Sequence, residues 1–109
     1  MIMKCSRFTT ITTKDLVSCL KAEVNFRCSS AIGKKEKRNN VNVYVAWSYA
    51  TIIAIKAVGS EQWILNAQKY SQTTSRLQNA VRQAADEIIP CDSEEEFQDC
   101  VFKELKVTI

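Results

Sequence analysis

The fold is decided by the stretch Val41-Asn42-Val43-Tyr44-Val45-Ala46-Trp47, in which valine or tryptophan occupies every second position. Successive side chains of a strand point to opposite faces of its sheet, so this pattern predicts a strand with one buried face. Asn42, Tyr44 and Ala46 then lie on the opposite side. Residues 51–58 and 62–66 are predicted to form two further strands, with Gly59-Ser60 as turn residues between them. Because the connections are short, we expect an antiparallel β-meander over about residues 41–66.

Two helices are predicted after the meander. Apolar residues recur at helical spacing from Leu77 to Ile88, which predicts an amphipathic helix at about 74–88 that Pro90 ends. The last helix, at about 93–105, is expected to begin at Ser93, which has capping-box spacing to Glu96.

The region before the meander is more polar. Residues 7–11 have the β-branched character of a short strand, and Thr12 or Thr13 then caps a helix that runs to about residue 23. The stretch at about 29–40 lacks apolar periodicity, so we interpret it as an exposed basic loop. Its cations are Lys34, Lys35, Lys37 and Arg38. They are spaced closely enough to contact phosphates; the alternative is a loop that only solubilises the protein.

Together these elements predict one α+β domain over residues 1–109. The expected architecture is a three- or four-stranded antiparallel sheet with about three helices packed on one face. No apolar run reaches the ~18 residues of a membrane span, and the first residues lack the apolar stretch of a secretory signal. We therefore expect a cytoplasmic protein without a membrane partner.

The sequence offers little that resembles a catalytic or metal site. It contains no histidine, which is the commonest general base and a usual zinc ligand, and its five cysteines include no Cys-x-x-Cys pair. Gly33 and Gly59 alone cannot build a phosphate-binding loop. We expect no catalytic residue, no metal and no cofactor. Reduced thiols are expected at the cysteines, with a Cys19–Cys28 or an intermolecular disulfide as the alternative.

Charge is distributed unevenly along the chain. Residues 1–82 hold 13 Lys and Arg against 4 Asp and Glu, a net of +9, whereas residues 83–109 hold 2 against 8, a net of −6. Such asymmetry indicates either a contact between the two parts or two surfaces of opposite sign.

Besides the basic loop, two groups of side chains are candidates for binding a partner. The first lies on the outward face of the predicted helix at 74–88 and consists of Arg76, Asn79 and Arg82. Such side chains could hold an anionic group or read a nucleic-acid edge; alternatively the polar face merely meets water. The second is the acidic run Glu94, Glu95, Glu96 and Asp99. It could bind a basic protein groove or mimic the phosphates of a nucleic acid; alternatively it is a solvated first helical turn that suits the helix dipole.

A resemblance to a known family rests on three segments, Ser48-Tyr49-Ala50-Thr51-Ile52-Ile53-Ala54, Trp63-Ile64-Leu65-Asn66 and Tyr70-Ser71-Gln72-Thr73-Thr74-Ser75-Arg76-Leu77-Gln78-Asn79. They resemble a family of small bacteriophage and prophage proteins of uncharacterised function, with the pattern Tyr-Ser-x-Thr-Thr-Ser-x-x-Gln-Asn as the most specific part. The likeness covers about residues 44–82. It implies a phage or mobile-element setting and no settled activity.

The leading functional hypothesis is a phage-derived protein that stoichiometrically inhibits a host protein or ribonucleoprotein complex, as anti-CRISPR proteins do. This step is an analogy, because neither setting nor fold fixes a function. The alternative is a small nucleic-acid-binding or regulatory protein that uses the basic loop together with Lys69, Arg76 and Arg82. Either protein could be a monomer or a homodimer, since an open strand edge or an exposed aromatic residue supports dimers.

Overall fold

The computed structural model describes residues 13–27 and 30–109, so the strand predicted at 7–11 lies outside the described residues. Within these ranges no helix is long and apolar enough to span a membrane. Along the chain the elements are α1 (Thr13–Lys21), β1 (Phe26–Arg27), β2 (Ala31–Arg38), β3 (Val41–Ser48), β4 (Thr51–Ala57), β5 (Gln62–Asn66), α2 (Gln72–Ala84), β6 (Glu87–Cys91) and α3 (Glu94–Leu105).

The strands form one sheet in the order β1-β2-β3-β4-β5-β6. The first five pair as an antiparallel meander, and β6 runs parallel to β5 after the chain has crossed over through α2. The α+β class is confirmed. The predicted sheet was wrong in its size and type, because six strands form a mixed sheet where three or four antiparallel strands were expected.

The predicted basic loop at 29–40 is wrong, because residues 31–38 form strand β2 and pair along their whole length with β3. The connecting turn places Asn39 and Asn40 at φ of 50° and 65°. Asparagine tolerates this left-handed conformation better than most residues, and two such residues suit a tight hairpin. Pattern reasoning failed here because much of β2 is solvent-exposed, so its sequence carries no apolar alternation although its backbone is fully paired.

The predicted helix at 74–88 is correct in its centre and wrong at its end. Helix α2 begins after the N-cap Ser71 and ends at Ala84. Residues 87–91 form β6, in which Ile89 pairs with Ile64. Pro90 therefore lies within an edge strand, where a missing backbone N–H is tolerated, and does not end the helix. Helix α3 follows its prediction closely, since the side chain of Ser93 accepts the N–H of Glu96 as an N-cap.

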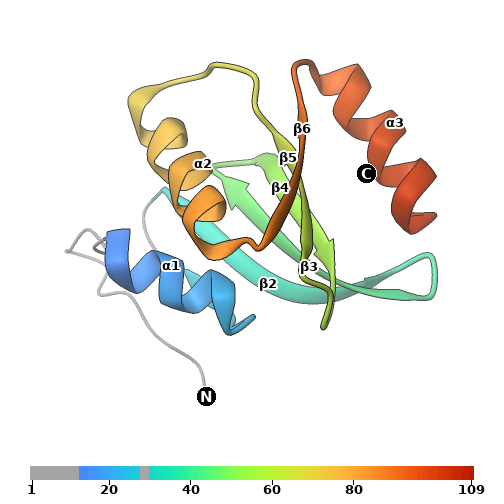
Figure 1. Ribbon diagram of the computed structural model, residues 1–109, viewed down its shortest axis with the longest axis horizontal. Coiled ribbons are helices and arrows are strands. Elements are labelled where there is room, and N and C mark those ends of the chain that lie inside the picture. Colours follow the sequence, from blue (N-terminus) through green and yellow to red (C-terminus); the bar gives the residue numbers. More distant parts are fainter. Residues whose placement is uncertain (1–12, 28–29) are drawn as a thin grey trace.

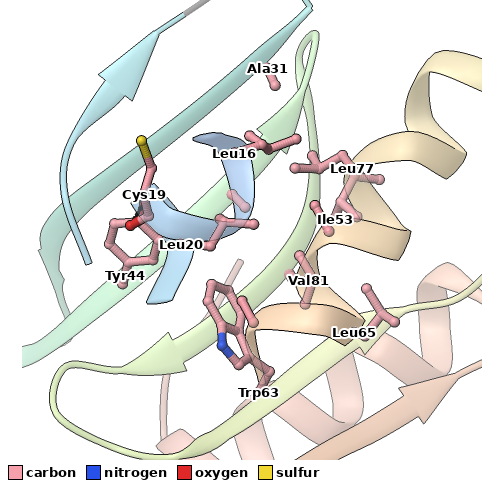
Figure 2. Packing of buried hydrophobic residues seen from close by; sticks show 14 of the residues in the cluster. Leu16, Cys19, Leu20, Ala31, Tyr44, Ile53, Trp63, Leu65, Leu77 and Val81 are labelled. Carbon is pink, nitrogen blue, oxygen red and sulfur yellow. Dashed lines mark hydrogen bonds between the residues drawn. The ribbon is translucent and has the colours of Figure 1, made fainter. Parts of the chain in front are cut away.

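Helices cover both faces of the sheet, contrary to the expectation that they pack on one (Figure 1). Helices α1 and α2 bury one face. Figure 2 shows Leu20 of α1 and Val81 of α2 converging on Trp63 of β5. Helix α3 buries the other face, with Phe97 and Val101 against Val45. Strand β3 thus has two buried faces where one was predicted, because Tyr44 and Ala46 are also fully buried.

Candidate partner-binding groove

A groove lies at the end of the sheet where β4 begins, beside the loop that follows β5 and the first turn of α3. Its volume is about 440 Å³. The lining residues are Ala50, Thr51, Ile52, Gln68, Tyr70, Glu94 and Ile109. The groove therefore combines the apolar side chains of Ala50, Ile52 and Ile109 with one carboxylate, that of Glu94.

A buried asparagine holds two walls of this groove in place. Asn66, at the end of β5, is fully buried. Its Nδ2 donates to the Tyr70 hydroxyl at 3.0 Å and to Oε2 of Glu94 at 2.9 Å. Its Oδ1 accepts the backbone N–H of Gln68 at 3.0 Å. Glu94 is thus fixed by a donor from another element, so its carboxylate is positioned before any partner arrives.

A second layer of buried polar side chains ties helix α2 to the same loop. Nε2 of Gln78 donates to the carbonyl oxygens of Asn66 at 2.8 Å and of Gln68 at 2.9 Å. The hydroxyls of Ser48 and Thr74 share a hydrogen bond of 2.8 Å that joins the end of β3 to α2. Since a buried polar group is costly without a partner, this network specifies one arrangement of the loop. Ser48, Asn66, Thr74 and Gln78 therefore have a structural role in building the groove.

Two exposed tyrosines lie in or beside the groove. Tyr70 lines it and is 38% exposed. Tyr49 directly precedes the lining residues Ala50 and Thr51 and is 62% exposed. Tyr49 also has φ of 54°, a left-handed conformation that costs a non-glycine residue roughly 1–2 kcal/mol. Backbone strain of this kind often marks functional positions.

The predicted acidic run is divided between the groove and the surface of α3. Glu94 lines the groove, whereas Glu95, Glu96 and Asp99 are exposed along the helix. Glu96 also accepts the backbone N–H of Asp92 at 3.4 Å, close to the capping-box arrangement predicted. The acidic surface therefore begins inside the groove and continues outward along α3.

The predicted residues of α2 lie on the other side of the sheet from the acidic run. Asn79 and Arg82 are exposed and joined by a hydrogen bond of 3.1 Å from Nη1 of Arg82 to Oδ1 of Asn79. Arg76 is half-buried. Because α2 and α3 pack on opposite faces of the sheet, one flat partner surface cannot touch both groups.

The four cations of β2 do not form one patch. Alternation along a strand sends Lys35 and Lys37 to the face that α1 and α2 cover, and Lys34 and Arg38 to the face of α3. Arg38 is engaged within the fold, since its Nε lies 3.1 Å from a carboxylate oxygen of Glu36. The basic segment is therefore a two-sided strand, and its cations do not act as one loop.

A second hollow, of about 210 Å³, contains a buried ion pair that sequence reasoning missed. Lys56 Nζ lies 2.7 Å from Oε2 of Glu23 and 5.7 Å from the ring centroid of Trp63. Burial alone would raise the pKa of Glu23. The hydrogen bonds from Lys56 and the N–H of Gly59, with the charges of Lys56 and Lys35, outweigh burial and lower that pKa. The sequence did contain one indication of this ion pair, which is that Lys56 interrupts the apolar run of β4.

Within residues 13–27 and 30–109 no group of three or more metal-ligating side chains lies close enough to hold an ion. Cys91 and Cys100 are free thiols, while Cys28, the partner of Cys19 in the alternative disulfide, lies outside the described residues. Burial and the neighbouring Cys100 raise the pKa of Cys91 to about 12, so its thiol stays protonated near neutral pH and is a weak nucleophile.

The described residues thus form a small mixed-sheet fold with a groove at the end of the sheet where β4 begins. The chain belongs to DUF8033, a family of unknown function, whose model matches residues 15–99. That match includes all six strands, helix α2 and the first half of α3. No curated protein and no solved structure matches the chain.

Proposed function

We propose that this protein acts by binding a protein partner in the Tyr70 groove, and that it stoichiometrically inhibits a host defence complex in the cytoplasm of the host cell, as anti-CRISPR proteins do. The observation that carries the proposal is the groove itself, in which an exposed tyrosine and a fixed carboxylate lie side by side. The biological setting rests on the resemblance of residues 44–82 to small phage proteins; within that stretch Ser48, Asn66, Thr74 and Gln78 build the network behind the groove.

The chemistry of the groove favours a protein over a small molecule. Tyrosine is enriched among residues that dominate protein interfaces, since it contributes a large contact area with few rotatable bonds. The groove is open at the surface, and the helix that supplies Glu94 also carries the exposed carboxylates Glu95 and Asp99. The partner surface should therefore carry lysine or arginine around one apolar side chain that enters beside Ile52.

Inhibition by this route requires no reaction. A partner surface covered by the groove and by α3 is blocked for its normal ligand, and the effect saturates at one copy per site. Because Asn66 already fixes Glu94, little side-chain entropy is lost on binding at this position.

The experiment is a tagged pull-down from host lysate, with and without nuclease, followed by titration of the purified partner in a calorimeter. We expect a nuclease-resistant host protein that binds at one to one. Tyr70→Ala and Thr51→Arg should each weaken its binding at least about tenfold, as expected for residues that line the interface. Val58→Ala is the matched control, because Val58 is 38% exposed like Tyr70 and follows the other end of β4. Equal affinity of all three variants and the unchanged protein would refute the groove as the binding site.

A further inference from the structure

The outward face of helix α2 is a second surface that the proposed protein-binding function leaves unused. Four residues at intervals of three or four form a stripe along it, with Ser75 and Arg82 beside them. The stripe consists of Gln72, Arg76, Asn79 and Gln83. With Ser75 these residues line one shallow hollow of about 340 Å³. Helix α2 contains no Asp or Glu.

These side chains are the types that read base edges in the major groove of DNA. Arginine donates two hydrogen bonds to guanine, and the amides of asparagine and glutamine pair with the donor and acceptor of adenine. Helix α2 has 13 residues, so it is about 20 Å long, and the stripe presents such a group on each turn. The Arg82 to Asn79 hydrogen bond fixes the orientation of the Asn79 amide while leaving its Nδ2 donor directed elsewhere.

Electrostatics favour a polyanion along helix α2, although Glu23, Glu61 and Asp86 lie on the same side of the sheet around the hollow of Lys56. Helices α1 and α2 together carry Lys14, Lys21, Arg76 and Arg82 against the single carboxylate Asp15. Lys35 and Lys37 project from the same sheet face. Helix α3, on the opposite face, carries five carboxylates against one lysine. Helices α2 and α3 thus differ in charge, and they lie on opposite faces of the sheet (Figure 1).

We infer that helix α2 binds B-form duplex DNA by placing this stripe in the major groove. Single strands are bound by aromatic residues on which bases stack, and the exposed aromatic residues Tyr49, Tyr70 and Phe102 all lie outside the stripe. The major groove of duplex RNA is too narrow for a helix. This inference does not depend on the protein-binding groove, which lies at another surface.

The test is fluorescence anisotropy with a labelled duplex of about 20 base pairs at about 50 mM salt, compared with single-stranded DNA and duplex RNA. Arg76→Gln combined with Arg82→Gln should weaken duplex binding at least about tenfold and reduce the salt dependence by roughly two counterions. Lys103→Gln combined with Lys106→Gln removes the same charge from the α3 side and should change the affinity less than about twofold.

A second variant separates base reading from charge. Asn79→Ala with Gln83→Ala keeps every cation, so it should leave the salt dependence unchanged and reduce the preference among duplex sequences. Circular dichroism and thermal unfolding verify that each variant is folded. Absence of duplex binding at low salt, equal loss in the two charge-matched double variants, or tighter binding of single strands or RNA would each overturn the inference. The variant with both Arg76→Gln and Arg82→Gln should still capture the protein partner, because these residues lie outside the Tyr70 groove; the pull-down therefore tests the groove separately from DNA binding.

Discussion

Lys56 of β4 and Glu23, two residues beyond α1, form a buried ion pair with 2.7 Å between Nζ and Oε2. Glu23 also accepts the backbone N–H of Gly59 at 2.9 Å, so one carboxylate joins the end of α1 to a strand and to a turn. Lys56 in turn lies over the ring of the buried Trp63. The pair closes one end of the α1–α2 layer and helps to position that layer on the sheet.

We expect the stability of the protein to fall in acid partly through Glu23. The pKa of Glu23 is lowered below its ordinary value of 4.5, so its contribution is fully present above about pH 4.5 and is lost as pH falls through the folded value. Glu23→Gln should therefore lower the free energy of unfolding at pH 7 by roughly 2 kcal/mol, less than for a fully buried pair because Glu23 reaches water. The measurement is urea unfolding from pH 7 to pH 3. If the difference in unfolding free energy between Glu23→Gln and the unchanged protein does not shrink in acid, the ion pair does not cause the loss of stability.

Replacement of Asn66 by aspartate should disrupt the groove without changing side-chain size. The new carboxylate would face Oε2 of Glu94, where the amide now donates at 2.9 Å, and the Tyr70 hydroxyl, which now accepts from the amide, could donate to only one of the two carboxylates. We expect Asn66→Asp to cost about 3 kcal/mol of unfolding free energy at neutral pH, as a buried unpaired charge does.

Glu94→Gln tests whether charge repulsion causes the loss of stability in Asn66→Asp, because it removes the carboxylate that the new aspartate would face. Glu94→Gln should restore part of the lost stability in the double variant, and a double-mutant cycle measured by urea unfolding gives the coupling. Additive effects of the two substitutions would show that Asn66 does not act through Glu94.

Position 33 in β2 requires a glycine, because the side chains of Phe26 and Tyr44 lie close to its Cα atom. A Cβ atom at Gly33 would overlap the ring of Phe26 and the hydroxyl of Tyr44. Tyr44 cannot move easily, since its hydroxyl donates to the carbonyl of Val24 at 2.8 Å. Gly33→Ala should therefore destabilise the fold by about 1–3 kcal/mol. Gly59→Ala is the control: φ there is +85° and no atom lies within 4 Å of the added Cβ, so only a backbone cost of about 1 kcal/mol is expected. Thermal unfolding distinguishes the two, and equal losses would contradict the steric explanation.

Sequence patterns correctly predicted the elements in which buried side chains recur at the regular spacing of a strand or a helix. The meander and α3 were predicted from alternation and from the Ser93 cap, and α2 from the stripe that includes Leu77. Strand β2 was missed because its backbone pairs while many of its side chains face water. Strand β6 was missed because Ile88 also continues the helical spacing of α2, and only pairing with β5 reveals it as a strand.

The candidate site was predicted far less completely, for a physical reason. Only Glu94 of the groove was among the predicted contact residues. Asn66 and Gln78 are polar residues that a sequence assigns to the surface, yet both are buried because the fold supplies their hydrogen-bond partners. Asn66 and Glu94 are 28 residues apart along the chain. Their contact depends on β5 and α3 packing together, which no local pattern encodes.

Tyr49 offers a substitution for which binding and stability should change in opposite directions. Its φ of 54° is unfavourable for any residue with a Cβ atom, and its 62% exposed side chain contributes little to the core. Tyr49→Gly should therefore leave the free energy of unfolding unchanged or raise it by up to about 1 kcal/mol. The same substitution removes the aromatic side chain beside the groove, so the affinity for the protein partner should fall at least about tenfold. Urea unfolding and calorimetric titration measure the two effects. A Tyr49→Gly protein that is less stable, or that keeps its partner affinity, would show that the left-handed tyrosine serves the hairpin and not recognition.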